Sequence, residues 1–301
     1  MLATLLSAAL AGIDGRIVRV EVDVSPGLPS FTVVGLPDTS VRESRDRVRT
    51  AIRNSDYEFP WQHITINLAP PDVRKEGAAY DLPIALGILA ATGATPSRSY
   101  TDVVVVGSLS LDGEVRPTGG VLPVAIAAAR AGIGAAIVPA ANAAEAAVVR
   151  GLDVWPVATL DEAAGALADR IEAHRYAGTD GGAAAADDPA CGDFADIRGQ
   201  QAARRALEVA AAGGHHVLLT GPPGSGKTMM ARSLAGILPP LTDSESLEVT
   251  SIHSVAGLLP GGTGLVRARP FRAPHHTISD VALVGGGAHP RPGELSLAHG
   301  G

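Results

Sequence analysis

The sequence predicts an α/β protein built from two domains, and three observations support this prediction. The chain has 301 residues, which is enough for two domains that each bury a core of their own. Its first half alternates short strand-like runs with helical runs, as α/β and α+β domains do. Near the middle, residues 178–192 read GTDGGAAAADDPACG, a small and acidic stretch without a large apolar residue, so we expect a linker there.

The predicted domain boundaries follow from this linker. We place an N-terminal domain over residues 1–176, a linker over residues 177–192 and a C-terminal domain over residues 193–301. In the N-terminal domain the apolar periodicity predicts strands over residues 15–24, 63–68, 103–108 and 135–139 and helices over residues 40–55, 80–91 and 121–131. Two further short units follow. This order of elements is typical of an α+β or α/β domain.

The first ten residues are apolar and have two interpretations. No Lys or Arg precedes Arg16 and no convincing cleavage site follows, so we predict a first strand over residues 1–10; a secretory signal peptide is the alternative. The other apolar stretches are interrupted by Pro, Gly or Arg well before the roughly 20 residues that a membrane helix needs. We therefore expect no transmembrane span and no membrane partner.

Composition and charge narrow the classes of function. The chain is 46% hydrophobic and 18% charged, as globular proteins are, and its formal net charge is −7. An acidic chain does not coat nucleic acid by bulk electrostatics, so any contact with phosphates has to be local. Cys191 is the single cysteine and can form no internal disulfide, which favours a reducing, cytoplasmic location.

A glycine-rich loop stands near the start of the C-terminal domain. An Ala-rich helix is predicted over residues 200–212 and ends at Gly213. The run HVLLT over residues 216–220 predicts a buried strand, and it leads directly into GPPGSGKT over residues 221–228. This octapeptide fully matches the pattern G-x-x-x-x-G-K-[ST], known as the P-loop, and the strand before it and the helix after it are the context that the pattern requires.

The P-loop predicts a binding site for a nucleoside triphosphate. Glycines permit the positive φ angles that let backbone N–H groups converge on the phosphates, and Lys227 would reach the β and γ phosphates. A helix predicted over residues 228–238 would add its positive N-terminal end. We expect ATP to contact nine residues, with Thr228 also holding Mg²⁺: Gly221, Pro222, Pro223, Gly224, Ser225, Gly226, Lys227, Thr228 and Met229. A structural glycine turn is the alternative.

Hydrolysis needs further residues, which we do not find downstream of the P-loop. A P-loop ATPase uses a second apolar strand that ends in two acids, one for Mg²⁺ and one for the attacking water. Asp161 and Glu162 follow an apolar stretch but lie upstream of the loop, where we expect them to cap a helix. Asp280 precedes an apolar run instead of ending one. We therefore assign no catalytic residue within this chain.

Long segments of the chain resemble the YifB/ComM family of magnesium-chelatase-like AAA+ ATPases. They include GHHVLLTGPPGSGKTMMARSLAGILPPL, EVTSIHSVAGLL and RPFRAPHHTISDVALVGGG in the C-terminal domain, and GLPDTSVRESRDRVRTAI and NLAPPDVRKEGAAYDLPIALGILAATG in the N-terminal domain. The resemblance covers nearly the whole chain apart from the linker. It implies a P-loop AAA+ domain that is truncated just before its acidic Walker B pair, which this family carries directly after the sequence HGG.

The same resemblance implies a function for the full-length protein. It would form a ring of identical subunits, expected to be a hexamer, that hydrolyses ATP and acts on DNA as a branch-migration helicase in transformation and recombination. A nucleotide-binding fragment that does not hydrolyse ATP is the alternative. A magnesium chelatase subunit is disfavoured, because the first domain is similar to the ribosomal-S5-like domain of Lon proteases.

The resemblance to Lon proteases raises proteolysis as a rival function. Such proteases use a Ser nucleophile in a loop before a helix and a Lys shortly after a Gly-Gly step. No serine lies between Thr65 and Pro96, and the residues after Gly119 and Gly120 are Val121, Leu-Pro-Val, with no lysine. We therefore expect the scaffold of a protease without its dyad, and we interpret the domain as a regulatory or assembly module.

One stretch of the C-terminal domain is locally basic. Residues 251–279 contain three arginines and three histidines but no Asp or Glu. Arg267, Arg269 and Arg272 are candidate contacts to a DNA backbone. The alternative is structural: Arg272 and the pair His275 and His276 would bond to backbone carbonyl groups of a folded insertion. Zinc binding is disfavoured, since two adjacent histidines without further ligands make a poor site.

Overall fold

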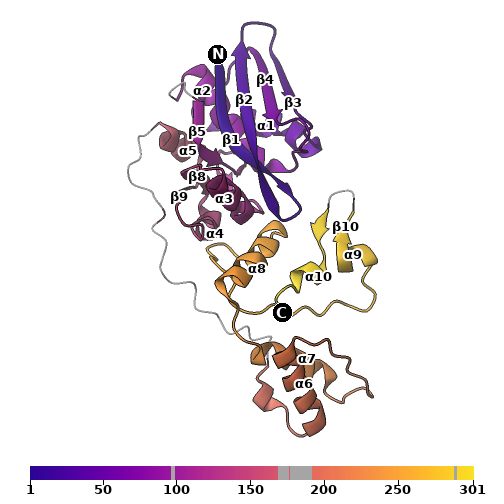
Figure 1. The fold of residues 1–301 in the computed structure, drawn as a ribbon. Coiled ribbons are helices and arrows are strands. Elements are labelled where there is room, and N and C mark those ends of the chain that lie inside the picture. The colour runs from indigo at the N-terminus through magenta and orange to yellow at the C-terminus, as the bar shows by residue number, and fades with distance from the viewer. Residues whose placement is uncertain (96–98, 169–175, 177–191, 288–289) are drawn as a thin grey trace. The chain divides into compact units, whose positions relative to one another are not determined.

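The computed structural model in Figure 1 describes residues 1–95, 99–168, 176, 192–287 and 290–301. It divides into two compact units: the N-terminal unit, residues 1–180 and 253–264, and the C-terminal unit, residues 181–252 and 265–301. The linker predicted over residues 177–192 lies outside the described residues, apart from Gly192.

One segment does not follow the boundaries that the sequence predicts. Residues 253–264, expected in the C-terminal domain, belong to the N-terminal unit. Two backbone hydrogen bonds show why: Gly120 N donates to Ser254 O at 2.9 Å, and Gly262 N donates to Ala141 O at 3.1 Å. These pairings join positions more than a hundred residues apart, which local sequence patterns do not register.

A seven-stranded mixed sheet forms the centre of the N-terminal unit, with strand order β3-β4-β2-β1-β5-β8-β9. The strands are β1 (Leu2–Ala11), β2 (Asp14–Ser25), β3 (Ser30–Val34), β4 (His63–Ala69), β5 (Ser99–Val105), β8 (Ala135–Pro139) and β9 (Asp153–Val157). The pairs β1·β2 and β2·β4 are antiparallel, and the other four pairs are parallel. The predicted α/β fold class is therefore confirmed, including a strand over the first ten residues.

Alternation in the sequence sets the register of the antiparallel strands. Val20 pairs with Leu68 and Val22 with Ile66, and all four side chains are fully buried. The residues between them face the other way, since successive side chains of a strand point to opposite faces. A shift of one residue would expose the whole valine row, so the burial pattern fixes the register.

Helices cover the sheet on two sides, as Figure 1 shows. One core cluster joins the sheet to α1 (Thr39–Asn54), α2 (Asp81–Thr92) and α5 (Leu160–Leu167), and a second joins it to α3 (Val121–Arg130) and α4 (Ala143–Ala146). Val103 and Val105 of β5 belong to the first cluster, while Val104 belongs to the second. A strand buried on both faces reads as a continuous apolar run, which explains the three valines at the end of β5.

The predicted helices of this unit are confirmed to within two residues at their ends. The Asp38 carboxylate accepts a hydrogen bond from Val41 N at 2.8 Å and so caps the start of α1, while Gly93 ends α2 in a left-handed conformation. The remaining short elements are η1 (Ala78–Tyr80), β6 (Ser108–Leu109), β7 (Val115–Arg116) and η2 (Ala140–Asn142). The strand predicted over residues 103–108 is thus split between β5 and β6.

The C-terminal unit is mainly helical. Its elements are η3 (Phe194–Asp196), α6 (Gln201–Gly213), α7 (Lys227–Leu234), η4 (Ala235–Ile237), α8 (Asp243–Val255), α9 (Asp280–Val284), β10 (Gly285–Gly286), β11 (Arg291–Pro292) and α10 (Glu294–Leu297); the last three residues of α8 belong to the N-terminal unit. The helix predicted over residues 200–212 is confirmed. The helix predicted over residues 228–238 is shorter, because its last turn is the 3₁₀ helix η4.

The strand predicted over residues 216–220 is not formed. A strand needs a neighbour to pair its backbone N–H and C=O groups. Among the described residues of the C-terminal unit, the strands are β10 and β11, which pair only with each other. The apolar run is therefore without regular secondary structure and largely accessible, and Leu218 is 87% exposed.

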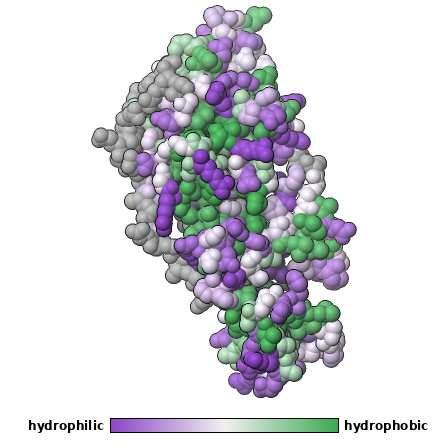
Figure 2. Space-filling view, viewed as in Figure 1, coloured by the Kyte–Doolittle hydropathy of each residue, from purple (hydrophilic) through white to green (hydrophobic). Residues whose placement is uncertain are grey.

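The surface mixes polar and apolar residues, and the face drawn in Figure 2 carries both kinds side by side. None of the helices in the described part of the chain combines the length and the apolar character that crossing a bilayer requires.

Candidate functional site

The backbone of the P-loop has the geometry that its glycines predict. Gly221, Gly224 and Gly226 have φ angles of 155°, 78° and 83°, which residues with a Cβ atom rarely adopt. Gly226 also stands at the N-cap of α7 and offers no side chain to cap it. The N–H groups of the first turn of α7 therefore lack a side-chain acceptor, which leaves them for an anion.

Lys227 is held against the loop by neutral acceptors. Its Nζ atom lies 2.9 Å from Gly221 O, 2.7 Å from Pro222 O and 3.3 Å from Ser225 Oγ. An ammonium group forms stronger hydrogen bonds to an anionic oxygen than to a carbonyl oxygen. A phosphate group entering the loop would therefore compete well for this side chain.

The other predicted contacts lie on the surface around this lysine. Pro222, Pro223 and Gly224 are exposed in the loop, and Thr228 and Met229 are exposed in the first turn of α7. The structure thus presents the nine predicted residues as one accessible loop and helix start. Contact with ATP and Mg²⁺ stays a prediction for each of them.

A small apolar cluster anchors α7 beneath the loop. Met230 is buried together with Phe194, Ile197 and Leu207. Because Met230 follows the exposed Met229 directly, the helix turns one methionine inward and the other outward. This packing fixes the helix that carries Lys227 and Thr228 without help from a sheet.

The basic stretch is neutralised by acids from elsewhere in the C-terminal unit, which the sequence did not predict. Two short hydrogen bonds of 2.6 Å each join the guanidinium of Arg272 to the carboxylate of Glu294, and Arg267 pairs with Asp243. Hydrogen bonds from Arg272 also hold the pKa of Glu294 below its ordinary value. Acids outside residues 251–279 therefore pair with all three arginines, and contact of these arginines with DNA stays a prediction.

Arg269 and the histidines have local partners as well. Arg269 donates to Pro239 O at 2.5 Å and to Gly300 O at 2.6 Å. His275 Nδ1 lies 2.7 Å from Thr277 Oγ1, and its ring centroid is 4.1 Å from that of His276. The carbonyl contacts predicted for Arg272 are thus made by Arg269. Among the described residues, no three His, Cys, Asp or Glu side chains gather as metal ligands would.

The region of the N-terminal unit where a Lon-type dyad is expected holds other side chains. After Gly120, Val121 and Leu122 are buried in the core at the start of α3. At the start of α2, Asp81 is buried and receives two hydrogen bonds from Arg47, at 2.7 and 3.0 Å. This pair is a buried structural link between α1 and α2, which sequence reasoning missed because its members are 34 residues apart.

Lys75 is a second residue that sequence reasoning missed. It is fully buried, and its Nζ donates to Pro70 O. Burial lowers the pKa of its ammonium group, since removing a charge from water disfavours the charged form. Its backbone also pairs with Leu36 O and Asp38 N, so the side chain and main chain together hold the loop ahead of α2.

Comparison with protein families matches both units. A family model described as magnesium chelatase, subunit ChlI, matches residues 193–301, which include the P-loop. A second model, described as subunit ChlI of Mg-chelatase, matches residues 20–142 of the N-terminal unit.

Relatives match along the whole chain. The chain is 45% identical to the uncharacterized protein YifB of Salmonella typhimurium over 302 residues, covering 100% of this chain and 58% of that protein. It is 42% identical to the competence protein ComM of Haemophilus influenzae over 308 residues, covering 100% of this chain and 59% of that protein. The chain therefore spans less than two thirds of the length of these relatives.

Half of the chain is also similar to a protease. Lon protease 1 of Hydrogenovibrio crunogenus is 29% identical over 162 residues, which are 50% of this chain and 20% of that protein. This similarity fits the α/β fold of the N-terminal unit. Together with the two ChlI matches and the relatives that align along the entire chain, it leads to one assignment: the chain belongs to the magnesium-chelatase-like family that includes YifB and ComM.

Proposed function

We propose that this chain binds ATP, with Mg²⁺, at the P-loop over residues 221–228. The observation that carries the proposal is the loop itself, in which three glycines with positive φ angles precede an uncapped helix start and Lys227 is held over the loop. The ChlI family matches support nucleotide use in general. The nest of N–H groups, the helix terminus and the ammonium group would each contribute favourable charge toward the phosphates.

We further propose that the full-length protein is a ring of identical subunits that uses ATP to act on DNA. The support is the relative named as a competence protein, which aligns with the whole chain. Branch migration during transformation or recombination is the DNA activity that we favour. The N-terminal unit would then serve in regulation or assembly and not in proteolysis.

The three arginines differ as candidate DNA contacts. The side chain of Arg269 is 15% exposed and binds two carbonyl groups, so it is better suited to bracing the fold. Arg267 and Arg272 are each 36% exposed and pair with carboxylates near the surface. Because exposed ion pairs are weak, a phosphate could replace those carboxylates. We therefore propose Arg267 and Arg272 ahead of Arg269 as DNA contacts.

A second function, nucleotide binding without hydrolysis, is favoured by one observation. Among the 301 residues, no apolar run after the P-loop ends in a pair of acids. Phosphate binding depends on groups that the chain has, whereas hydrolysis also needs acids that hold Mg²⁺ and order the attacking water. We expect this chain to bind ATP or ADP and to release phosphate only at the background rate.

Calorimetry with ATP and ADP tests the site, and phosphate release tests hydrolysis. Lys227→Ala should weaken binding by roughly tenfold or more, corresponding to about 1.5–3 kcal/mol for a charge-assisted contact. Arg232→Ala, an exposed cation in the last turn of the same helix, is the matched control and should bind as the unchanged chain does. Equal affinity in Lys227→Ala would refute the site. If the unchanged chain releases phosphate above background and Lys227→Ala does not, the proposal that this chain does not hydrolyse ATP would be refuted.

A further inference from the structure

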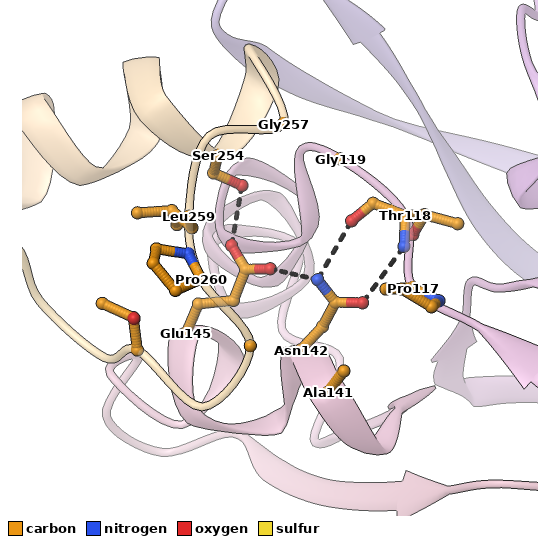
Figure 3. A pocket seen from close by; sticks show the side chains of 12 residues that line it. Pro117, Thr118, Gly119, Ala141, Asn142, Glu145, Ser254, Gly257, Leu259 and Pro260 are labelled. Carbon is orange, nitrogen blue, oxygen red and sulfur yellow. Dashed lines mark hydrogen bonds between the residues drawn. The ribbon is translucent and has the colours of Figure 1, made fainter.

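A half-open cavity of about 300 Å³ lies within the N-terminal unit. Its walls come from the residues around Thr118, from η2 and α4, and from the segment 253–264 that packs against them (Figure 3). Gly257 and Pro260 contribute to the wall on the side of that segment. Five of the lining side chains are polar, and three of these form a connected network.

Glu145 is the centre of this network. Its side chain lies between Asn142 and Ser254 in Figure 3, and the residue is 3% exposed. Oε1 accepts a hydrogen bond from Asn142 Nδ2 at 2.5 Å, and Oε2 accepts one from Ser254 Oγ at 2.7 Å. Asn142 is itself fixed by two hydrogen bonds to the backbone of Thr118, at 3.0 and 3.1 Å. The carboxyl group is therefore held in one orientation at the cavity wall.

Among the residues that the structure describes, no cation accompanies this carboxyl group. Within the described residues it forms no ion pair, and its hydrogen-bond donors are a neutral amide, a hydroxyl and the backbone of Leu122. Burial raises the pKa of Glu145 above its ordinary value, more than these hydrogen bonds lower it. A buried carboxylate without a counter-ion is costly, and a cation brought by a ligand would remove that cost.

A second group in the cavity wall is unsatisfied. Thr118 Oγ1 is buried and has no hydrogen-bond partner. Buried hydroxyl groups normally have one, and exceptions often mark a place for a missing partner. This hydroxyl lies below the surface of the cavity, so the acceptor that the cavity itself presents is the carboxylate without a counter-ion.

We propose that this cavity binds a primary alkylammonium group, with Glu145 as its counter-ion. An ammonium group is a compact charge with three donors, so one donor can reach the carboxylate from within the cavity. A guanidinium group needs both carboxylate oxygens free along one edge. Both oxygens of Glu145 already accept a hydrogen bond, which disfavours that alternative.

The ammonium group must come from outside the chain. The sequence contains two lysines, Lys75 and Lys227. Lys75 is fully buried and donates to Pro70 O, and Lys227 is bound by its own loop. The amine of Met1 is already engaged, since it donates a hydrogen bond to Val24 O. The occupant is thus either a free polyamine or a lysine side chain from outside residues 1–301.

Calorimetric titration of the full chain at about 0.15 M salt, which screens non-specific attraction to an acidic protein, tests the proposal. The two probes are spermidine and a capped Gly-Lys-Gly peptide, with capped Gly-norleucine-Gly as the uncharged control. We expect saturable binding of at least one amine and none of the norleucine peptide. Binding of spermidine alone would identify a free polyamine as the source, and binding of the peptide alone would identify a protein side chain. Binding of neither amine would overturn the proposal.

Variants locate the binding. Glu145→Gln should weaken amine binding by tenfold or more, and Glu145→Asp, which keeps the charge but draws it back from the cavity, by about threefold. Glu58→Gln, an exposed acid of the same unit, is the control and should bind as the unchanged chain does. If Glu145→Gln does not fold, as judged by circular dichroism, the Glu145→Asp result decides. Unchanged affinity in a folded Glu145→Gln, or in Glu145→Asp, would overturn the site.

Discussion

The two units are held together by different kinds of interaction. The N-terminal unit buries a continuous apolar core on both faces of a seven-stranded sheet. The C-terminal unit buries a small cluster around Phe194 and Met230 and a few further apolar side chains such as Val249. Arginine pairs such as that between Arg272 and Glu294 add to these contacts. Apolar burial scales with the area removed from water, whereas exposed ion pairs contribute little. We infer that most of the stability of the chain resides in the N-terminal unit.

The largest difference between the two units should appear in their thermal unfolding as separate fragments. We expect a fragment of residues 1–176 to unfold in one cooperative transition, because its sheet and both core clusters lie within it. A fragment of residues 193–301 should melt broadly, since its described core is small. Differential scanning calorimetry on both fragments makes the comparison. A sharp transition for residues 193–301 would contradict the comparison, because it would show that the smaller core also folds cooperatively.

Core substitutions should destabilise the N-terminal unit more than the C-terminal unit. This difference should be smaller than the difference between the two fragments. Leu86 is fully buried in α2, and Leu86→Ala should cost about 3–4 kcal/mol in the free energy of unfolding, through lost burial and a residual cavity. Leu207→Ala in the smaller cluster should cost about 2 kcal/mol, since a loosely surrounded site can collapse. Urea unfolding measures both. The exposed Leu111→Ala is the control, and equal costs at Leu86 and Leu207 would contradict the comparison.

The arginine pairs should contribute less than either core. Glu294→Gln removes the charge that accepts both hydrogen bonds from Arg272 and should cost roughly 0.5–1 kcal/mol, because the pair is partly exposed. Raising the salt concentration should shrink this difference, since salt screens exposed charges. Thermal unfolding of the full chain at low and high salt would measure both effects. If Glu294→Gln lowers the free energy of unfolding by several kcal/mol, ion pairs supply much of the stability of the C-terminal unit.

The pH dependence should have opposite signs in the two units. The pKa of Glu145 is raised in the folded chain, so its contribution to stability is present at low pH and is lost as pH rises through the folded pKa. The pKa of Glu294 is lowered, so its contribution is present above the ordinary Glu pKa and is lost as pH falls through the folded pKa. Relative to the unchanged chain, Glu145→Gln should therefore gain stability from pH 4 to pH 8, and Glu294→Gln should lose it. The same sign for both variants would disprove the contrast between buried and exposed carboxylates.

Local sequence patterns correctly predicted the elements that depend on nearby residues, such as a helix cap, or on a repeated alternation of apolar residues. The valine alternation of β2 and the capping residue Asp38 of α1 were sufficient to place those elements. The same logic failed for residues 216–220, which have the apolar sequence of a strand. Strand formation depends on a neighbouring strand, and none pairs with this run in the described part of the C-terminal unit.

For the candidate site, the sequence by itself determined the P-loop, because the positive φ angles at Gly221, Gly224 and Gly226 follow from residue type and spacing over eight positions. Only the tertiary structure decided which acids pair with the arginines and that Ser254 bonds to Glu145, 109 residues away. The physical reason is the range of the interactions. Backbone conformation is set by neighbouring residues, whereas the burial and pairing of charges depend on which distant segments the folded chain brings into contact.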